Sequence, residues 1–337
     1  MTSFLPRQAF EAPKSIPKTY FLGHHHAGAN KIKTLISNIG LVLECRDFRL
    51  PLSTHNPHLE NTIAGCERFV VYTKSDLGKD SSTAQSTLRR LYGDKALFWD
   101  KHRPSTTGSL LRKIKDVAKM QDSLTGLRVM VVGMPNVGKS TIINALRSAG
   151  VQGKTAKAAK TGDQAGVTRK IGTSVRIVDS EAKGGIAGGV FVLDTPGIFQ
   201  PYVEDGETMI KVALAHGIKK GLIPDEVLVD YLLYRLNLWD PSVYKQYCEP
   251  TNDVNDFLNA VAIHDGKLKL GGVPNWQEAA ARTLSLWRDG KLGRFVLDEL
   301  SEEDIQAHET VVRQPSLSVN QARKLLKASR QQSRKSD

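Results

Sequence analysis

The chain has 337 residues, of which 40% are hydrophobic and 24% are charged, and its formal net charge is +12. This length predicts about two domains of ordinary globular composition, and the charge indicates a polyanionic partner, either nucleic acid or an anionic membrane surface, with solvated surface charge as the alternative. Three widely spaced cysteines without a CxxC pair argue against a disulfide framework or a zinc site and favour a reducing compartment, and no apolar run reaches the roughly 18 residues that cross a bilayer.

The first 22 residues combine three basic residues with a single acid, Glu11, and prolines at positions 6, 13 and 17 interrupt any helix. This composition is typical of a flexible arm. It makes a poor amphipathic targeting peptide, which stays open as the alternative. We assign residues 1–27 to an N-terminal arm.

Strand and helix patterns alternate in the following segment, residues 28–205. Short apolar, β-rich runs predict buried strands at 41–44, 69–72, 128–132 and 190–193, with a further strand-like run at 96–99. Helical patterns lie between them at 30–39, 86–91, 109–120 and 139–148. This alternation predicts an α/β domain with a mostly parallel sheet and helices on both faces.

Residues 149–189 are rich in Gly, Ala, Lys and Thr, which predicts a mobile basic loop leading into a strand pair. After Pro201 only helical patterns follow, at 209–221, 225–238, 254–263, 276–288, 302–308 and 318–329. We therefore expect a smaller helical domain at residues 206–337. Beyond residue 309 it carries seven Lys or Arg residues and one acid, Asp337, a density suited to RNA phosphates.

A phosphate-binding pattern follows the strand predicted at 128–132. Residues 133–140 read G-M-P-N-V-G-K-S, which fits G-x-x-x-x-G-K-[ST] between a strand and a helix. The glycines let backbone N–H groups face a β-phosphate, Lys139 would neutralise the β- and γ-phosphates, and Ser140 would ligate Mg²⁺. A chance glycine-lysine loop is the alternative. The residues expected to bind nucleotide here are Asn136, Val137, Gly138, Lys139, Ser140 and Thr141.

A second phosphate-site motif, D-T-P-G, ends the strand predicted at 190–193. Asp194 lies where Mg²⁺ needs a carboxylate anchor, and Gly197 can bring its backbone N–H to a γ-phosphate because it has no side chain. Thr168, in the basic loop between the two motifs, offers a hydroxyl that would complete the Mg²⁺ shell, although an ordinary loop threonine is the alternative.

A third motif, T-K-S-D, follows the strand predicted at 69–72, upstream of the other two. The carboxylate of Asp76 suits the N1–H and exocyclic amine of guanine, a donor pair that adenine lacks. The stem of Lys74 would cover the base. In isolation this motif is weak, because Ser and Asp are also ordinary turn residues.

The order of these motifs resembles that of the circularly permuted GTPases, in which the base-reading motif precedes the phosphate-binding loop. The likeness is greatest to the YlqF/RbgA family and its mitochondrial branch, over roughly residues 20–300. Five further segments carry it: Gly23-His24, D-F-R-L-P at 47–51 with Asn56-Pro57, G-V-T-R at 166–169, P-G-I-F at 196–199, and R-D-G-K-L-G-R at 288–294. The sequence departs from the family pattern at Thr73 (usually Asn), Phe48 (Ala) and Ala165 (Pro), and the loop that backs the guanine is expected near residues 98–101.

The resemblance implies a GTP-hydrolysing factor that assists assembly of a large ribosomal subunit and contacts its rRNA. For the mitochondrial branch it implies the matrix side of the inner membrane, with peripheral membrane association; a cytoplasmic location is the alternative. Basic residues of the loop are also expected on rRNA phosphates: Lys154, Lys157, Lys160, Arg169 and Lys170.

The hydrolytic water poses a separate question, because Ile198 follows Gly197 where many GTPases carry a water-orienting Gln. By resemblance His24 is the candidate catalytic residue beside Lys139 and Gly197, and Asn136 would help to hold K⁺; the run at 24–26 also reads as a surface patch or a weak metal chelator. Two other functions stay open, a P-loop ATPase or nucleotide kinase and an RNA-binding scaffold that binds GTP without hydrolysing it.

Overall fold

The computed structural model describes residues 4–20, 23–152, 159, 172–181, 185–203 and 205–314, and residues 320, 321, 324, 325, 327 and 328 of the tail. Within these residues one sheet has the strand order β3-β2-β1-β4-β6-β5. Neighbouring strands are parallel, except that β5 runs antiparallel to β6. The strands are β1 (Leu41–Asp47), β2 (Arg68–Thr73), β3 (Ala96–Phe98), β4 (Leu127–Gly133), β5 (Val175–Val178) and β6 (Val190–Asp194).

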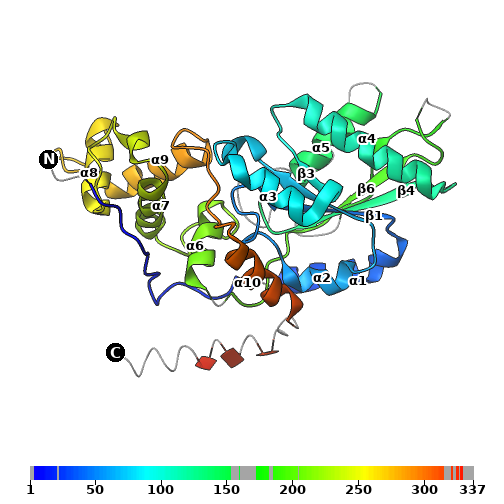
Figure 1. Cartoon of the computed structure of the whole chain (residues 1–337), viewed down its shortest axis with the longest axis horizontal. Helices are drawn as coiled ribbons and strands as arrows, with labels where there is room; N and C mark the ends of the chain where they lie inside the picture. The colour runs from blue at the N-terminus through cyan, green and yellow to red at the C-terminus, as the bar shows by residue number, and fades with distance from the viewer. Residues whose placement is uncertain are drawn as a thin grey trace.

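Helices cover both faces of this sheet (Figure 1), as the alternating sequence pattern predicted. The helices of this sheet body are α1 (Gly23–Leu35), α2 (Pro57–Ile63), α3 (Ser82–Tyr92), α4 (Pro104–Gln121) and α5 (Lys139–Gly150). Val42 of β1 packs with Ile32 of α1 on one face, whereas Leu43 packs in the core that holds Ile114 of α4 and Ile142 of α5 on the other. Successive strand residues point to opposite faces, so one strand serves both layers.

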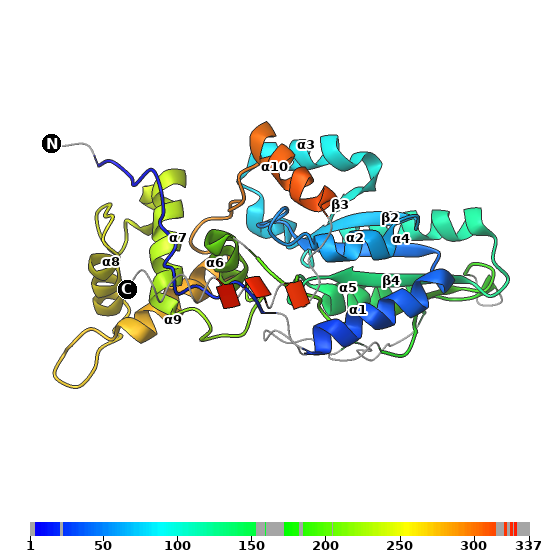
Figure 2. The same ribbon diagram turned by 90° about the horizontal axis from the view of Figure 1, so that it is seen from below.

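The helical body lies beside one end of the sheet, and a last helix returns to the sheet body (Figures 1 and 2). The helices are α6 (Gly206–Leu214), α7 (Asp225–Trp239), α8 (Val254–His264), α9 (Trp276–Arg288) and α10 (Glu302–Arg313). The helix expected at 209–221 ends early because His216 adopts a left-handed conformation, with φ of 63°. The segment expected to be helical at 318–329 lies largely outside the described residues.

The N-terminal arm is packed, which corrects the expectation of a flexible segment. The ring of Phe10 lies 5.1 Å from that of Tyr231 on α7, and Arg7 forms an ion pair of 2.7 Å with Asp230. Ile16 is buried in the main core. These apolar and charged contacts fix the path of residues 4–20, which form no helix, along the helical body.

The strand expected at 41–44 continues to Asp47 because its charged residues are paired inside the protein. All seven residues of β1 are buried. Arg46 donates to Glu44 at 2.6 Å, and Asp47 accepts from Arg49 at 2.8 Å. Since burying an unpaired charge is costly, these pairs let a charged segment remain in a central strand.

Two helices near the N-terminus also differ from the predicted pattern. The helix expected at 30–39 begins at Gly23, where two glycines and three histidines weaken the helical signal. Helix α2 was not predicted. It begins at Pro57, and its N-cap Asn56 accepts a hydrogen bond from the backbone of His58, a capping arrangement that starts so short a helix.

A histidine pair joins α10 to the sheet body, with His55 buried and His308 half-buried. Nδ1 of His55 lies 2.8 Å from Nε2 of His308, and Nε2 of His55 lies 2.6 Å from Glu60. Burial, together with the nearby Arg46 charge, lowers the pKa of His55, and burial beside His55 lowers that of His308 to about 3. Both histidines are therefore neutral in the folded chain at neutral pH.

We expect the free energy of unfolding to keep its full value above about pH 6.5 and to decrease as the pH falls below 6.5. The reason is that the histidines of the unfolded chain then bind protons, which the same histidines in the folded chain do not. The loss is at most about 1.4 kcal/mol per pH unit for each histidine. Urea unfolding between pH 7 and 5, above the range where most carboxylates titrate, measures it. His308→Gln should reduce the slope, although His58, whose pKa is also lowered by burial, keeps its own contribution; an unchanged slope would show that His308 is not responsible.

Candidate functional site

The glycine-rich loop between β4 and α5 has the conformation that a phosphate-binding loop requires. Gly133 and Gly138 have φ of 141° and 92°, values that side-chain-bearing residues rarely adopt. A Cβ on Gly133 would lie 2.3 Å from the carbonyl oxygen of Cys45 in the neighbouring strand β1. Only glycine therefore allows the loop to pass so close to the sheet and leave its N–H groups at the start of α5.

Lys139 lies inside this loop rather than in solvent. Its Nζ donates to the carbonyls of Met134 at 2.7 Å and Gly133 at 3.2 Å. Burial lowers the pKa of the ammonium to about 8, although the nearby Asp194 charge opposes this. A triphosphate would offer this buried cation charged acceptors, which bind it more strongly than neutral carbonyls do.

Ser140, in the first turn of α5, lies beside Asp194 at the end of β6. The Ser140 hydroxyl donates to Oδ2 of Asp194 at 2.9 Å. The other carboxylate oxygen, Oδ1, is buried and has no hydrogen-bond partner among the described residues, and burial raises the pKa of this carboxyl. A hydroxyl beside an unsatisfied carboxylate oxygen fits Mg²⁺, which prefers hard oxygen ligands. Thr168, the third expected ligand, lies outside the described residues.

The segment that follows Asp194 is held against the phosphate-binding loop. A Cβ on Gly197 would lie 2.5 Å from Cα of Pro135, so glycine is required for this approach. The backbone N–H of Ile198 donates to the carbonyl of Gly133 at 3.1 Å, and Asn56 donates to the carbonyl of Ile198 at 2.8 Å. Gly197 thus borders the phosphate loop.

The Ile198 side chain is fully buried between the sheet and α1, beside Ala29 and Ile32. It therefore neither reaches the phosphates nor orients water. His24, the candidate for that task, lies in the first turn of α1, and its side chain is outside the described residues.

The base-reading motif lies at the same edge of the sheet, because β2 is parallel to β1 and β1 to β4. Thr73 is fully buried, and its hydroxyl lies 2.5 Å from the carbonyl of Val137 in the phosphate loop. Lys74 donates to the carbonyl of Asn136 at 2.9 Å. The threonine at the position of the family's asparagine therefore contacts the phosphate loop.

Asp76 is half-buried in the short helical turn Ser75–Gly78 that follows. The backbone N–H of Ser75 donates to the carbonyl of Trp99 at 3.2 Å, which brings the segment at 98–101 beside the motif. This is the place where the loop that backs the guanine was expected. Its role toward a base stays a prediction.

In the sequence Asp47, Arg49 and Asn56 stand out only by family likeness, which indicates no task for them. In the structure Asp47 is fully buried and accepts from Lys74 at 2.8 Å, and Asn56 holds the carbonyl of Ile198. The signal was the close spacing of charged residues after a strand, which is hard to interpret until the partner of each charge is known.

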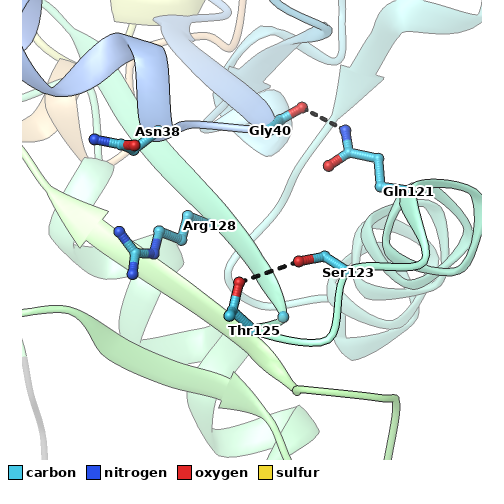
Figure 3. Close-up of a pocket in the computed structure, with 7 residues that line it drawn as sticks. Asn38, Gly40, Gln121, Ser123, Thr125 and Arg128 are labelled. Carbon is cyan, nitrogen blue, oxygen red and sulfur yellow. Dashed lines mark hydrogen bonds between the residues drawn. The ribbon is translucent and has the colours of Figure 1, made fainter.

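Two hollows in the described surface lie at the opposite edge of the sheet. One of them has a volume of about 250 Å³, and Gln121 beside it donates to the carbonyl of Gly40 at 2.9 Å. Figure 3 shows the residues that line it. It is lined by polar groups near the amino ends of β1 and β4. Open α/β sheets bind ligands at the carboxyl ends of their strands, where the three motifs meet, so the motif edge, and not this hollow, remains the expected nucleotide site.

Comparison with known proteins agrees with this geometry. The family model described as "50S ribosome-binding GTPase" matches residues 128–256, a range that starts at β4 and leaves the base-reading motif upstream. "Mitochondrial GTPase 1" of Schizosaccharomyces japonicus is 38% identical over 311 residues, covering 86% of this chain and 92% of that protein. "Mitochondrial ribosome-associated GTPase 1" of Xenopus tropicalis is 29% identical over 318 residues, covering 88% and 99%.

Among solved structures, the fold resembles GNP-bound YlqF from T. maritima. The two chains are 25% identical with a TM-score of 0.50, and the match covers 81% of this chain and 97% of that one.

Proposed function

Because this chain belongs to the mitochondrial GTPase 1 family of circularly permuted GTPases, we propose that it binds and hydrolyses GTP and assists assembly of the large ribosomal subunit in mitochondria. One observation carries the proposal. A base-reading motif from β2, a phosphate loop from β4 and a carboxylate from β6 meet at one sheet edge, joined by the Lys74–Asn136 and Ser140–Asp194 hydrogen bonds.

Each motif has a task in this proposal. The Asp76 carboxylate accepts the two guanine donors, and Lys74 covers the base. Lys139 and the N-terminal backbone of α5 bind the phosphates, and the Gly197 N–H reaches the γ-phosphate. Ser140, Asp194 and Thr168 hold Mg²⁺, which neutralises charge on the phosphate oxygens. By family resemblance Asn136 helps to hold K⁺; comparing turnover in potassium and sodium salts tests this.

The attacking water needs an orienting group other than Ile198, and we propose His24 for this task. A scaffold that binds GTP without turnover is the second candidate function, and the buried Ile198 is the observation that favours it. Turnover measured with and without large ribosomal subunits separates the two. GTP hydrolysis that exceeds the background of the subunits alone supports the enzyme, and its absence under both conditions supports the scaffold. A preference for ATP over GTP would instead support an ATPase or kinase.

We further propose that residues 206–337 form the domain that contacts rRNA, with residues 28–205 as the GTPase domain and residues 1–27 as the arm. Helix α6 begins only nine residues after Gly197. Order gained at Gly197 with GTP therefore passes directly into the helical part. The basic tail supplies phosphate contacts, and of its basic residues beyond α10 the structure describes Lys324 and Lys327, both exposed.

We expect large subunits to bind more tightly to the GTP-analogue form than to the GDP form, by roughly 5- to 150-fold. Sedimentation with purified subunits measures this. Replacing Arg323, Lys324, Lys327 and Arg330 together by Gln should weaken binding and flatten its salt dependence, with GTP affinity unchanged. Equal subunit binding with GTP analogue, GDP and no nucleotide would rule out the switch.

The relatives are named mitochondrial, and we propose that this chain lies on the matrix side of the inner membrane in peripheral contact with it. In the part of the chain that the structure describes, no helix has the length and apolarity of a membrane span. The protruding turn between α8 and α9 (Figure 2) offers a contact surface. Leu270 and Val273 there are 103% and 57% exposed, with Lys267 and Lys269 nearby and no acid from 266 to 275. Aliphatic tips beside lysines suit an anionic lipid interface.

Leu270→Glu is therefore expected to weaken binding to vesicles that contain anionic lipid. Burying one leucine contributes about 2 kcal/mol, which corresponds to roughly 30-fold in affinity. Vesicle flotation measures it. Leu124→Glu is the control, since Leu124 is 93% exposed but lies in the sheet body. Equal flotation of Leu270→Glu and the unaltered chain would remove this turn from membrane contact.

A further inference from the structure

The last turn of α9 makes two contacts through adjacent residues, one with the sheet body and one with the end of α6. Trp287 is buried, and the guanidinium carbon of Arg49 lies 4.6 Å from the centre of its ring. Arg288 donates from Nε to the carbonyl of Leu214, the last residue of α6, at 2.7 Å. One helix of the helical body thus reaches two different structures that border the nucleotide site.

The contact at Trp287 leads to the base-reading motif through buried charges. Arg49 donates from Nε and Nη2 to the Asp47 carboxylate at 3.0 and 2.8 Å. The same carboxylate accepts from Lys74 at 2.8 Å, and Lys74 also donates to the carbonyl of Asn136. Burial opposes ionisation of Asp47, but the two cations hold the pKa of this carboxyl well below its usual range. Every step from Trp287 to the phosphate loop is therefore a direct contact.

The contact at Arg288 leads to the same loop residue by another route. Arg288 holds the end of α6, and two residues later His216 takes its left-handed conformation. The carbonyl of His216 accepts a hydrogen bond of 2.7 Å from the side-chain amide of Asn136. Asn136 is thus held at its backbone by Lys74 and at its side chain by His216, and both holders depend on the last turn of α9.

Through these contacts the geometry of the nucleotide site depends on the position of α9. A shift of α9 against the sheet would separate Arg49 from the Trp287 ring and pull on the α6 end. Both changes would reach Asn136 through short, partly desolvated hydrogen bonds, which tolerate little stretching. The two routes differ in chemistry, one a cation stacked on a ring and the other a capped helix end, so each can be altered by itself.

We propose that Trp287 and Arg288 are positioning residues of the GTP site, through which docking of the helical body on a ribosomal subunit changes GTP affinity. The proposal rests on the proposed function, because it requires a subunit that binds the helical body. It assigns to α9 a second, non-covalent route between the helical body and the GTP site, in addition to the covalent junction after Gly197.

The test is a measurement of GTP-analogue affinity with and without saturating large subunits. The ratio of the two dissociation constants is the coupling factor, expected at roughly 5- to 150-fold for the unaltered chain. Trp287→Leu and Arg288→Gln should each bring it toward 1. Trp287→Phe, which keeps a ring for Arg49, should retain most of it. Arg282→Gln is the matched control, because Arg282 is exposed on the same helix and pairs with Asp265 at 2.8 Å, within the helical body.

Trp287→Leu removes a large buried ring and therefore also lowers stability, so a second variant is needed. Arg49→Lys alters the same contact from the sheet side, keeping the charge and losing the planar stacking. Thermal unfolding verifies that each variant is folded. Coupling equal to that of the unaltered chain in folded Arg49→Lys and Arg288→Gln would overturn the role of α9 and leave the proposed function standing. No coupling in the unaltered chain would instead contradict the GTP-dependent switch itself.

Discussion

Lys139→Ala is expected to weaken GTP binding by about 2–5 kcal/mol, the usual loss when one partner of a buried charge pair is truncated. This corresponds to roughly 30- to 4,000-fold in affinity. The reason is geometric, because the ammonium is already inside the phosphate loop, 2.7 Å from the Met134 carbonyl. Its removal leaves the β- and γ-phosphates without their cation. Titration with a fluorescent GTP analogue and a turnover assay measure the two effects.

Lys119→Ala is the matched control, since Lys119 is exposed on α4 and, among the described residues, its side chain makes no contact with the nucleotide motifs. Ser140→Ala tests the other half of the site and should weaken Mg²⁺-dependent binding, because Asp194 then loses its hydroxyl neighbour. If both Lys139→Ala and Ser140→Ala kept GTP-dependent turnover, the phosphate-loop assignment would be wrong.

His24→Ala provides a contrast within the same assay. A group that acts mainly in the transition state changes turnover and leaves GTP affinity nearly unchanged. We expect slower subunit-stimulated hydrolysis with an intact dissociation constant. Undiminished stimulated turnover would remove His24 from the chemistry.

Asp76→Asn is expected to change the base preference of the site from guanine to xanthine. An asparagine amide donates where the carboxylate accepts, so it opposes the N1–H and amine of guanine and suits the carbonyl that xanthine has in place of that amine. An unsatisfied pair of this kind costs about 1–3 kcal/mol, or roughly 5- to 140-fold in GTP affinity. Competition between GTP and xanthosine triphosphate measures the exchange.

Asp80→Asn serves as the control for this experiment, because Asp80 is exposed and contributes its backbone N–H, not its carboxylate, to a hydrogen bond with Arg294. GTP affinity that is the same in Asp76→Asn and the unaltered chain would mean that Asp76 does not read the base.

The sequence by itself determined the motifs and their permuted order, because each motif is a run of adjacent residues whose chemistry depends on local backbone. The start of α5 at Lys139 and the limits of α9 at Trp276 and Arg288 were predicted as they occur. Both follow from local signals, a glycine turn before one helix and a capping Asn275 before the other.

Only the tertiary structure decided where the charged and polar residues around these motifs lie. Asp47 and Arg49 pair with each other, but the ring above Arg49 belongs to Trp287, more than two hundred residues away in the chain. The burial of Ile198 beneath α1 and the bond from Asn136 to His216 are likewise contacts between distant segments. No periodicity or spacing encodes such contacts, because they depend on how whole helices pack after the local elements have formed.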